Sequence, residues 1–304
     1  MLVHEQKATC INTGCKKYVC SKCKKEKNES IGISEHNYDC AQTIMPTETE
    51  DGYDVCKCKE CGKEVKQNFR SFRDLTPLEQ LSVVKCSSNN YVYSAMPHEN
   101  NREVLQTVVD RRGNSGLSFL CKLDCDTSSE EMTRTIETGH KLLTCAYSVY
   151  VMSVGDTQKI GLLPYASGAE NLDLLVKNAE RIKEELGIGE ETDVLTAITL
   201  INQYICDNIV YDYSFSGDPI CFLTENKGTC AVYSMNFQII CQTCGIECYY
   251  VYDVKDSHAF NYILAPDGTK LYIDTCWNAG PVKRPKQYFL LPYEEFMAKH
   301  GWEP

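Results

Sequence analysis

The sequence predicts an α+β protein that begins with small cysteine-rich repeats. Three observations lead to this prediction. Eight of the nineteen cysteines fall within the first 61 residues, where two CxxC pairs recur 38 residues apart. Residues 170–245 carry apolar side chains at helical spacing, whereas residues 246–277 alternate with a period of two. Helices followed by an antiparallel sheet are typical of the α+β class.

Composition limits the kinds of function to consider. The chain of 304 residues is 43% hydrophobic and 24% charged, as in soluble globular proteins, and has room for two or three domains. Its net charge of -11 argues against a nucleic-acid partner, since the one basic block is KKYVCSKCKK. No run approaches the about 18 apolar residues of a membrane helix, and MLVHEQKATC does not read as a signal peptide. We expect three parts, at 1–65, 66–165 and 166–304.

The first part reads as two copies of one small unit. ATCINTGCKKYVCSKCKKE (8–26) aligns with PTETEDGYDVCKCKECGKE (46–64), so that Cys20 matches Cys58 and Cys23 matches Cys61. A CxxC turn aims two thiolates at one point, which suits tetrahedral Zn²⁺. Units this small bury little apolar surface, and a structural zinc ion would supply the missing stability.

The ligands that complete each metal site are less evident. Cys10 and Cys15 are available in the first copy, and Cys40 and Cys56 in the second, with His36 as a further candidate. Disulfides, or unpaired reduced thiols, are the alternatives to zinc. The candidate metal ligands are Cys10, Cys15, Cys20, Cys23, Cys40, Cys56, Cys58 and Cys61.

The second copy, EDGYDVCKCKECGKE, resembles short cysteine repeats of surface proteins from Gram-positive gut and soil bacteria. The first copy departs from that pattern with Cys15 in place of Tyr and Lys24 in place of Gly. The resemblance implies a wall-proximal or binding accessory module, and therefore a secreted or cell-surface protein.

The middle part is the least informative. Residues 67–85 look partly helical, residues 86–97 and 144–154 have the composition of strands, and residues 128–143 begin with a helix start signal. We expect His98 and His140 to be surface or packing residues.

The last part has the clearest pattern. The turn PDG at 266–268 separates two of its strands. The predicted helices are 170–187, 192–213, 231–245 and 292–300, and the predicted strands are 246–254, 258–265, 269–277 and 287–291.

Three residues of this part suggest nucleophilic catalysis. Cys230 lies where a loop becomes a helix, and the unpaired N–H groups there stabilise a thiolate. His258 opens one strand of the hairpin, and Asp274 lies near the end of the partner strand. A turn centred on PDG makes these two diagonal neighbours on one face. A thiolate, an imidazole that moves the proton and a carboxylate that orients the imidazole form a triad.

The motifs GTCAVY, GIECYYV, HAFN and DTCW follow one another in an order that resembles the transglutaminase-like superfamily of papain-like thiol enzymes, in its bacterial form. The resemblance covers roughly 170–304 and implies a nucleophile helix packed on an antiparallel sheet. It assigns the nucleophile to Cys230, the general base to His258 and the orienting carboxylate to Asp274. The chain departs from the usual pattern in HAFN, where HAWN is commoner, and in carrying Cys276 beside the site.

The same resemblance places Asn261 and Trp277 at positions that line or brace the site, and Tyr211 or Tyr213 is our candidate for an oxyanion donor. It implies a thiol acyl-transfer enzyme that acts on peptide or glutamine amides, as a peptidase, deamidase or cross-linking enzyme, with no cofactor for catalysis. The expected partner is a protein or peptide substrate, with cell-wall peptides among the candidates.

Two alternatives stay open. One is a catalytically inactive binding or structural module that keeps the fold. The other is a redox or metal device among the later cysteines, such as Cys241, Cys244 and Cys248.

Overall fold

A computed structural model describes residues 1–87, 121–122, 147–154, 157–164, 168–215, 217–253, 255–280 and 287–301. The chain is divided into two compact units, Met1–Thr76 and Pro77–Pro304. The predicted helix 128–143, most of the predicted strand 86–97, and His98 and His140 lie outside the described residues. Among the helices that are described, none is long and apolar enough to cross a membrane.

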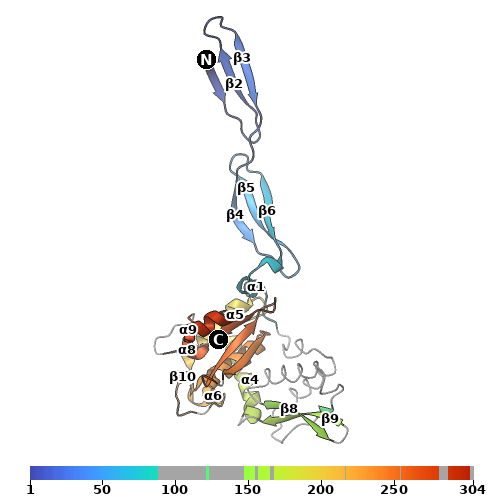
Figure 1. The fold of residues 1–304 in the computed structure, drawn as a ribbon, viewed down its shortest axis with the longest axis vertical. Coiled ribbons are helices and arrows are strands. Elements are labelled where there is room, and N and C mark those ends of the chain that lie inside the picture. The colour runs from blue at the N-terminus through green and yellow to red at the C-terminus, as the bar shows by residue number, and fades with distance from the viewer. Residues whose placement is uncertain are drawn as a thin grey trace. The chain divides into compact units, whose positions relative to one another are not determined.

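The first unit consists of two small antiparallel sheets, one for each repeat (Figure 1). β2 and β5 are the central strands, and each sheet joins its strands in chain order. The strands are β1 (Leu2–Gln6), β2 (Gly14–Val19), β3 (Glu26–Ile31), β4 (Tyr38–Ile44), β5 (Gly52–Cys58) and β6 (Glu64–Arg70), and the short helix η1 (Phe72–Asp74) follows.

The two sheets bury little apolar surface. Every residue of β1 is exposed, and β3 and β4 are nearly so. Gly14 and Gly52, matched by the repeat, are both buried because the preceding loop crosses them. A Cβ atom on Gly14 would lie 2.5 Å from the carbonyl oxygen of Gln6, and one on Gly52 would lie 2.5 Å from that of Ile44. The matched glycines therefore keep the same close backbone crossing in both repeats.

The second unit combines helices with two three-stranded sheets, β7-β9-β8 and β12-β13-β14. Its helices are α1 (Pro77–Val83), α4 (Gly168–Glu185), α5 (Val194–Asn208), α6 (Cys221–Glu225), α7 (Cys230–Thr243), α8 (Thr275–Asn278) and α9 (Tyr293–His300). Its strands are β7 (Cys121–Lys122), β8 (Tyr147–Val154), β9 (Thr157–Pro164), β10 (Val210–Tyr211), β11 (Lys227–Gly228), β12 (Cys248–Asp253), β13 (His258–Leu264) and β14 (Lys270–Ile273).

Helix α7 is the centre of this unit. It is buried on nearly every side, and it packs against α4 and α5 and against strands β12 and β13. Val232 and Phe237 of α7 are fully buried, and so are Ile201 of α5 and Ile263 of β13. This packing holds the first turn of α7 beside the start of β13, and the α+β fold predicted from the sequence is confirmed.

Three predicted elements differ in length. The helix predicted for 192–213 ends at Asn208, because Val210 and Tyr211 instead pair in parallel with β11. The strand predicted for 269–277 ends at Ile273, because the next residue caps α8. The strand predicted for 287–291 is a single bridge between Leu291 and Tyr272.

Candidate functional site

Cys230 is the first residue of α7. Its side chain lies at the helix N-terminus, where the backbone N–H groups of Ala231 and of Ala259 in β13 both interact with the sulfur. The residue is 8% exposed, so the thiol is largely shielded from solvent. Gly228 precedes it on β11, and a Cβ atom there would lie 2.5 Å from Cβ of Val232.

His258 and Asp274 meet through the register of the hairpin. Asn261 of β13 lies opposite Ile273 of β14, so Asp274 is the diagonal neighbour of His258. Nε2 of His258 lies 2.7 Å from Oδ2 of Asp274. His258 also interacts with the Cys230 thiol, and because Nε2 faces Asp274 the nitrogen left for this contact is Nδ1. The three residues that we expected to act together are therefore in one chain of contacts.

The electrostatics favour an ion pair between the thiol and the imidazole. Burial by itself would raise the pKa of Cys230, but the hydrogen bond and charge of His258 outweigh it and the pKa is lowered. Burial by itself would lower the pKa of His258, but the bonds to Asp274 and Cys230 raise it to about 9. Asp274 is fully buried, yet the hydrogen bonds from His258 and His300 keep its pKa below the usual value.

A cavity of about 1110 Å³ opens beside His258. Trp277 and Cys276 line it, as do Tyr211 and Tyr213. The walls mix aromatic rings with a few polar groups, as is usual in binding sites for small molecules or side chains. A substrate that entered this cavity would therefore meet the imidazole of His258.

The four residues predicted to line or brace the site lie in different places. Tyr211 and Tyr213 stack edge to face, with ring centroids 4.8 Å apart at the cavity wall. Trp277 is 38% exposed, and its ring lies 6.1 Å from that of His258. Asn261 does not face the cavity. Its Nδ2 donates to the carbonyl oxygen of Ser234 in α7, so it joins β13 to the nucleophile helix.

His300 was not predicted. It is the last residue of α9, 26 residues after Asp274, and its Nε2 lies 3.0 Å from Oδ2 of Asp274. Its side chain is completely buried. Nothing in the spacing of the sequence marks this residue, because α9 reaches the site only through tertiary packing.

One known family model covers the part of the chain that carries the three predicted triad residues. Residues 181–278 match the family model of the transglutaminase-like superfamily, and this range contains Cys230, His258 and Asp274. Residues 181–278 therefore form a transglutaminase-like domain. The predicted resemblance is therefore confirmed for about a third of the chain.

Two solved structures also match this chain. A proposed cysteine protease from Cytophaga hutchinsonii is 12% identical over 52% of this chain and 64% of its own, with a TM-score of 0.27. A TGase is 10% identical over 76% of this chain and 66% of its own, with a TM-score of 0.30. The chain thus spans just under two thirds of each, and we draw no inference from such low scores. A search of curated proteins found no match.

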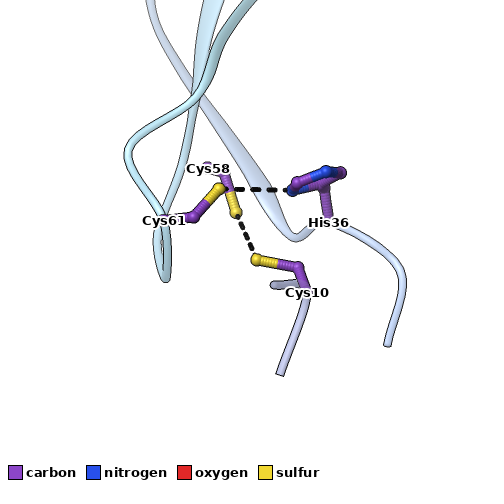
Figure 2. A group of neighbouring side chains, drawn as sticks. All are labelled: Cys10, His36, Cys58 and Cys61. Atoms are coloured by element: carbon purple, nitrogen blue, oxygen red, sulfur yellow. Dashed lines mark hydrogen bonds between the residues drawn. The ribbon is translucent and has the colours of Figure 1, made fainter. Parts of the chain in front are cut away.

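A second candidate site lies in the first unit, outside the transglutaminase-like domain. Cys10, His36, Cys58 and Cys61 point toward one another, with all four ligand atoms within 4.8 Å (Figure 2). Sγ of Cys10 lies 3.7 Å from Sγ of Cys58, and Sγ of Cys61 lies 3.4 Å from Nδ1 of His36. These four residues can hold a metal ion. Cys10 comes from the first repeat, Cys58 and Cys61 come from the second, and His36 lies in the segment between β3 and β4.

This cluster differs from the predicted ligand sets. We expected Cys40 and Cys56 among the ligands, but they are cross-strand neighbours joined by a disulfide bond. Cys15, Cys20 and Cys23 also lie outside the cluster. The sequence predicts a separate metal site in each repeat, whereas the one such cluster in the described part of the chain takes ligands from both repeats.

Proposed function

We propose that the transglutaminase-like domain is a thiol acyl-transfer enzyme that acts on peptide or glutamine amides. The observation that supports this most is the chain of contacts from Cys230 through His258 to Asp274, at a helix N-terminus beside a cavity. A lowered thiol pKa next to a raised imidazole pKa is the electrostatic pattern of an activated thiol nucleophile.

In the first half of the reaction the Cys230 thiolate attacks the carbonyl carbon of the amide. In this proposal the backbone N–H groups at the start of α7 stabilise the oxyanion, with Tyr211 at the cavity wall as the candidate side-chain donor. The tetrahedral intermediate collapses when His258 donates its proton to the leaving amine. The products are a thioester on Cys230, a free amine or ammonia, and neutral His258.

In the second half His258 accepts a proton from the incoming nucleophile, which attacks the thioester carbonyl. Water yields a carboxylic acid, so that the enzyme is a peptidase or a deamidase. An amine yields a new amide bond, so that the enzyme cross-links proteins. Asp274 remains ionised throughout and keeps Nε2 of His258 protonated. Residues of this chain carry out every step without a cofactor.

The test supplies each class of substrate in turn. Ammonia release from benzyloxycarbonyl-Gln-Gly, incorporation of dansylcadaverine into dimethylcasein, and cleavage of casein report deamidation, cross-linking and proteolysis. We expect one of these activities in the full chain, its loss in Cys230→Ser and its retention in Cys20→Ser, which changes an exposed thiol of the first unit. If all three are absent and Cys230 is alkylated no faster than Cys221, the domain is an inactive binding module.

We also propose that the metal held by Cys10, His36, Cys58 and Cys61 is a structural Zn²⁺. Zn–S bonds of about 2.3 Å and Zn–N bonds of about 2.0–2.1 Å in a tetrahedron separate two sulfurs by about 3.8 Å and a sulfur from a nitrogen by about 3.6 Å. Two of the six separations, 3.7 Å between the sulfurs of Cys10 and Cys58 and 3.4 Å from the sulfur of Cys61 to Nδ1 of His36, are close to these edges. The turn that presents Cys58 and Cys61 is closed by the N–H of Gly62 on the carbonyl of Cys58.

The ligands come from both repeats, so the zinc ion would join two sheets that bury little apolar surface. Elemental analysis of the full chain is expected to give one zinc per chain. Cys10→Ser removes a ligand and should lower that value strongly, while Cys23→Ser removes a thiol outside the cluster and should leave it unchanged. Equal zinc contents in the two variants would contradict this assignment.

We propose a secreted or cell-surface location with a protein or peptide substrate. The Cys40–Cys56 disulfide supports this, since disulfides persist in oxidising compartments.

A further inference from the structure

We propose that His300 is a positioning residue, doubly protonated, that holds the Asp274 carboxylate toward His258 and balances its charge. This inference rests on the proposed function of the domain. It concerns a histidine outside the triad and outside the segment that matches the family model.

The hydrogen-bond partners of His300 determine its protonation. Nδ1 lies 2.8 Å from the carbonyl oxygen of Phe296, which can only accept, so Nδ1 carries a proton. Nε2 lies 3.0 Å from Oδ2 of Asp274. An ionised carboxylate also only accepts, so Nε2 must donate as well. A neutral imidazole cannot donate from both nitrogens, and the contacts therefore fit an imidazolium.

The surroundings of His300 suit a buried cation. The residue ends α9, and the carbonyl groups at a helix C-terminus favour positive charge. The rings of Trp277, Tyr288 and Phe296 surround it, with centroids 4.3 to 4.4 Å from that of His300. Aromatic faces attract cations. A cage of this kind offsets part of the cost of burying the charge.

The donors that meet Asp274 show what His300 does. Oδ2 accepts hydrogen bonds from Nε2 of His258 at 2.7 Å and from Nε2 of His300 at 3.0 Å. Oδ1 accepts one from the backbone N–H of Trp277 at 2.9 Å. The carboxylate is thus held from three directions and has one orientation available. Without His300, His258 would be the one imidazole among the described residues that contacts the buried carboxylate of Asp274.

Within the described part of the chain, the structure places three titratable groups, those of Asp274, His258 and Tyr288, near the ring of His300. Asp274 at the cap of α8 contacts it directly, and His258 at the start of β13 lies 6.4 Å away between ring centroids. Tyr288 contributes its ring. On α9 itself, Lys299 pairs with Glu295 at the surface, 3.2 Å apart. Cys230 is affected indirectly, because His258 is the main influence that lowers the pKa of its thiol.

The first experiment observes the protonation of His300 directly. ¹⁵N NMR of the full chain labelled at histidine is recorded at pH 7, and the His300 ring is assigned through its contacts with Phe296 and Trp277. We expect protons on both ring nitrogens. A signal from an unprotonated nitrogen in the His300 ring overturns the inference. This measurement requires neither a variant nor enzymatic activity.

The second experiment uses His300→Gln, with Lys299→Gln as the matched control one residue away. Loss of a positive charge raises the pKa of nearby groups, so the midpoint for Cys230 alkylation by iodoacetamide should move to higher pH. Below the midpoint, the alkylation rate should fall roughly threefold or more, equivalent to about half a pKa unit. The control should match the wild type. A folded His300→Gln with an unchanged midpoint overturns the inference, because a merely structural residue would alter stability alone.

The two proposals fail in different ways. If Cys230 of the wild type shows no preferential alkylation, the proposed acyl transfer fails, while the NMR spectrum still reports the state of His300. If His300→Gln does not fold, the NMR measurement on the wild type decides whether His300 is doubly protonated.

Discussion

Asn261 of β13 donates a hydrogen bond from Nδ2 to the carbonyl oxygen of Ser234 in α7, at 3.0 Å. The strand that begins with His258 is thereby joined to the helix that begins with Cys230. The same amide group lies 3.3 Å from the carbonyl oxygen of Tyr249 in β12. One buried side chain therefore links the base, the nucleophile helix and the neighbouring strand.

Asn261→Ala should destabilise the protein by about 1–3 kcal/mol, because two buried carbonyl groups lose their partner. Urea unfolding of the transglutaminase-like domain within the full chain measures this. Asn208→Ala is the control, since Asn208 is exposed and donates to the carbonyl of Tyr204 within its own helix. Equal effects in the two variants would mean that the link between β13 and α7 is unimportant.

His258→Ala should slow alkylation of Cys230 near pH 6.5 by roughly tenfold or more, since each unit of pKa changes the thiolate fraction tenfold. The bond and charge of His258 are the main influences that lower the pKa of Cys230. Peptide mass spectrometry after a limiting dose of iodoacetamide provides the rates. Cys20, an exposed thiol of the first unit, is the internal reference and should react equally in both proteins.

Activity should have a bell-shaped pH dependence. At low pH the Cys230 thiolate gains a proton, and its lowered pKa places this limb below the usual range of a thiol. At high pH His258 loses the proton that the leaving amine needs, and its pKa of about 9 places the second limb there. The profile of kcat/KM with the best amide substrate tests this. A second limb near pH 6.5 would show that Asp274 does not support His258.

Gly228→Ala should destabilise the start of α7 by about 1–3 kcal/mol through overpacking. The new Cβ would lie 2.5 Å from Cβ of Val232, a fully buried residue whose position is set by the core. Urea unfolding gives the free energy. Gly189→Ala is the control, because nothing lies within 4 Å of a Cβ there, and this change should be nearly neutral. A neutral Gly228→Ala would show that the turn before Cys230 adapts without strain.

Much of the second unit could be predicted because its signals are local. Helical periodicity marks α4 and α5, and alternation marks β12 and β13. The PDG turn also predicted the register that brings Asp274 to His258, since strand pairing next to a short turn follows from counting residues.

The sequence by itself determined the α+β class, the transglutaminase-like core and the presence of a cysteine repeat, because periodicity and motif order are carried by neighbouring residues. Only the tertiary structure placed His300 on Asp274, and only it gathered Cys10 of the first repeat with Cys58 and Cys61 of the second and with His36 of the connecting segment. It also joined Cys40 to Cys56. These contacts depend on how separate elements pack in three dimensions, and no spacing along the chain specifies which distant side chains will meet.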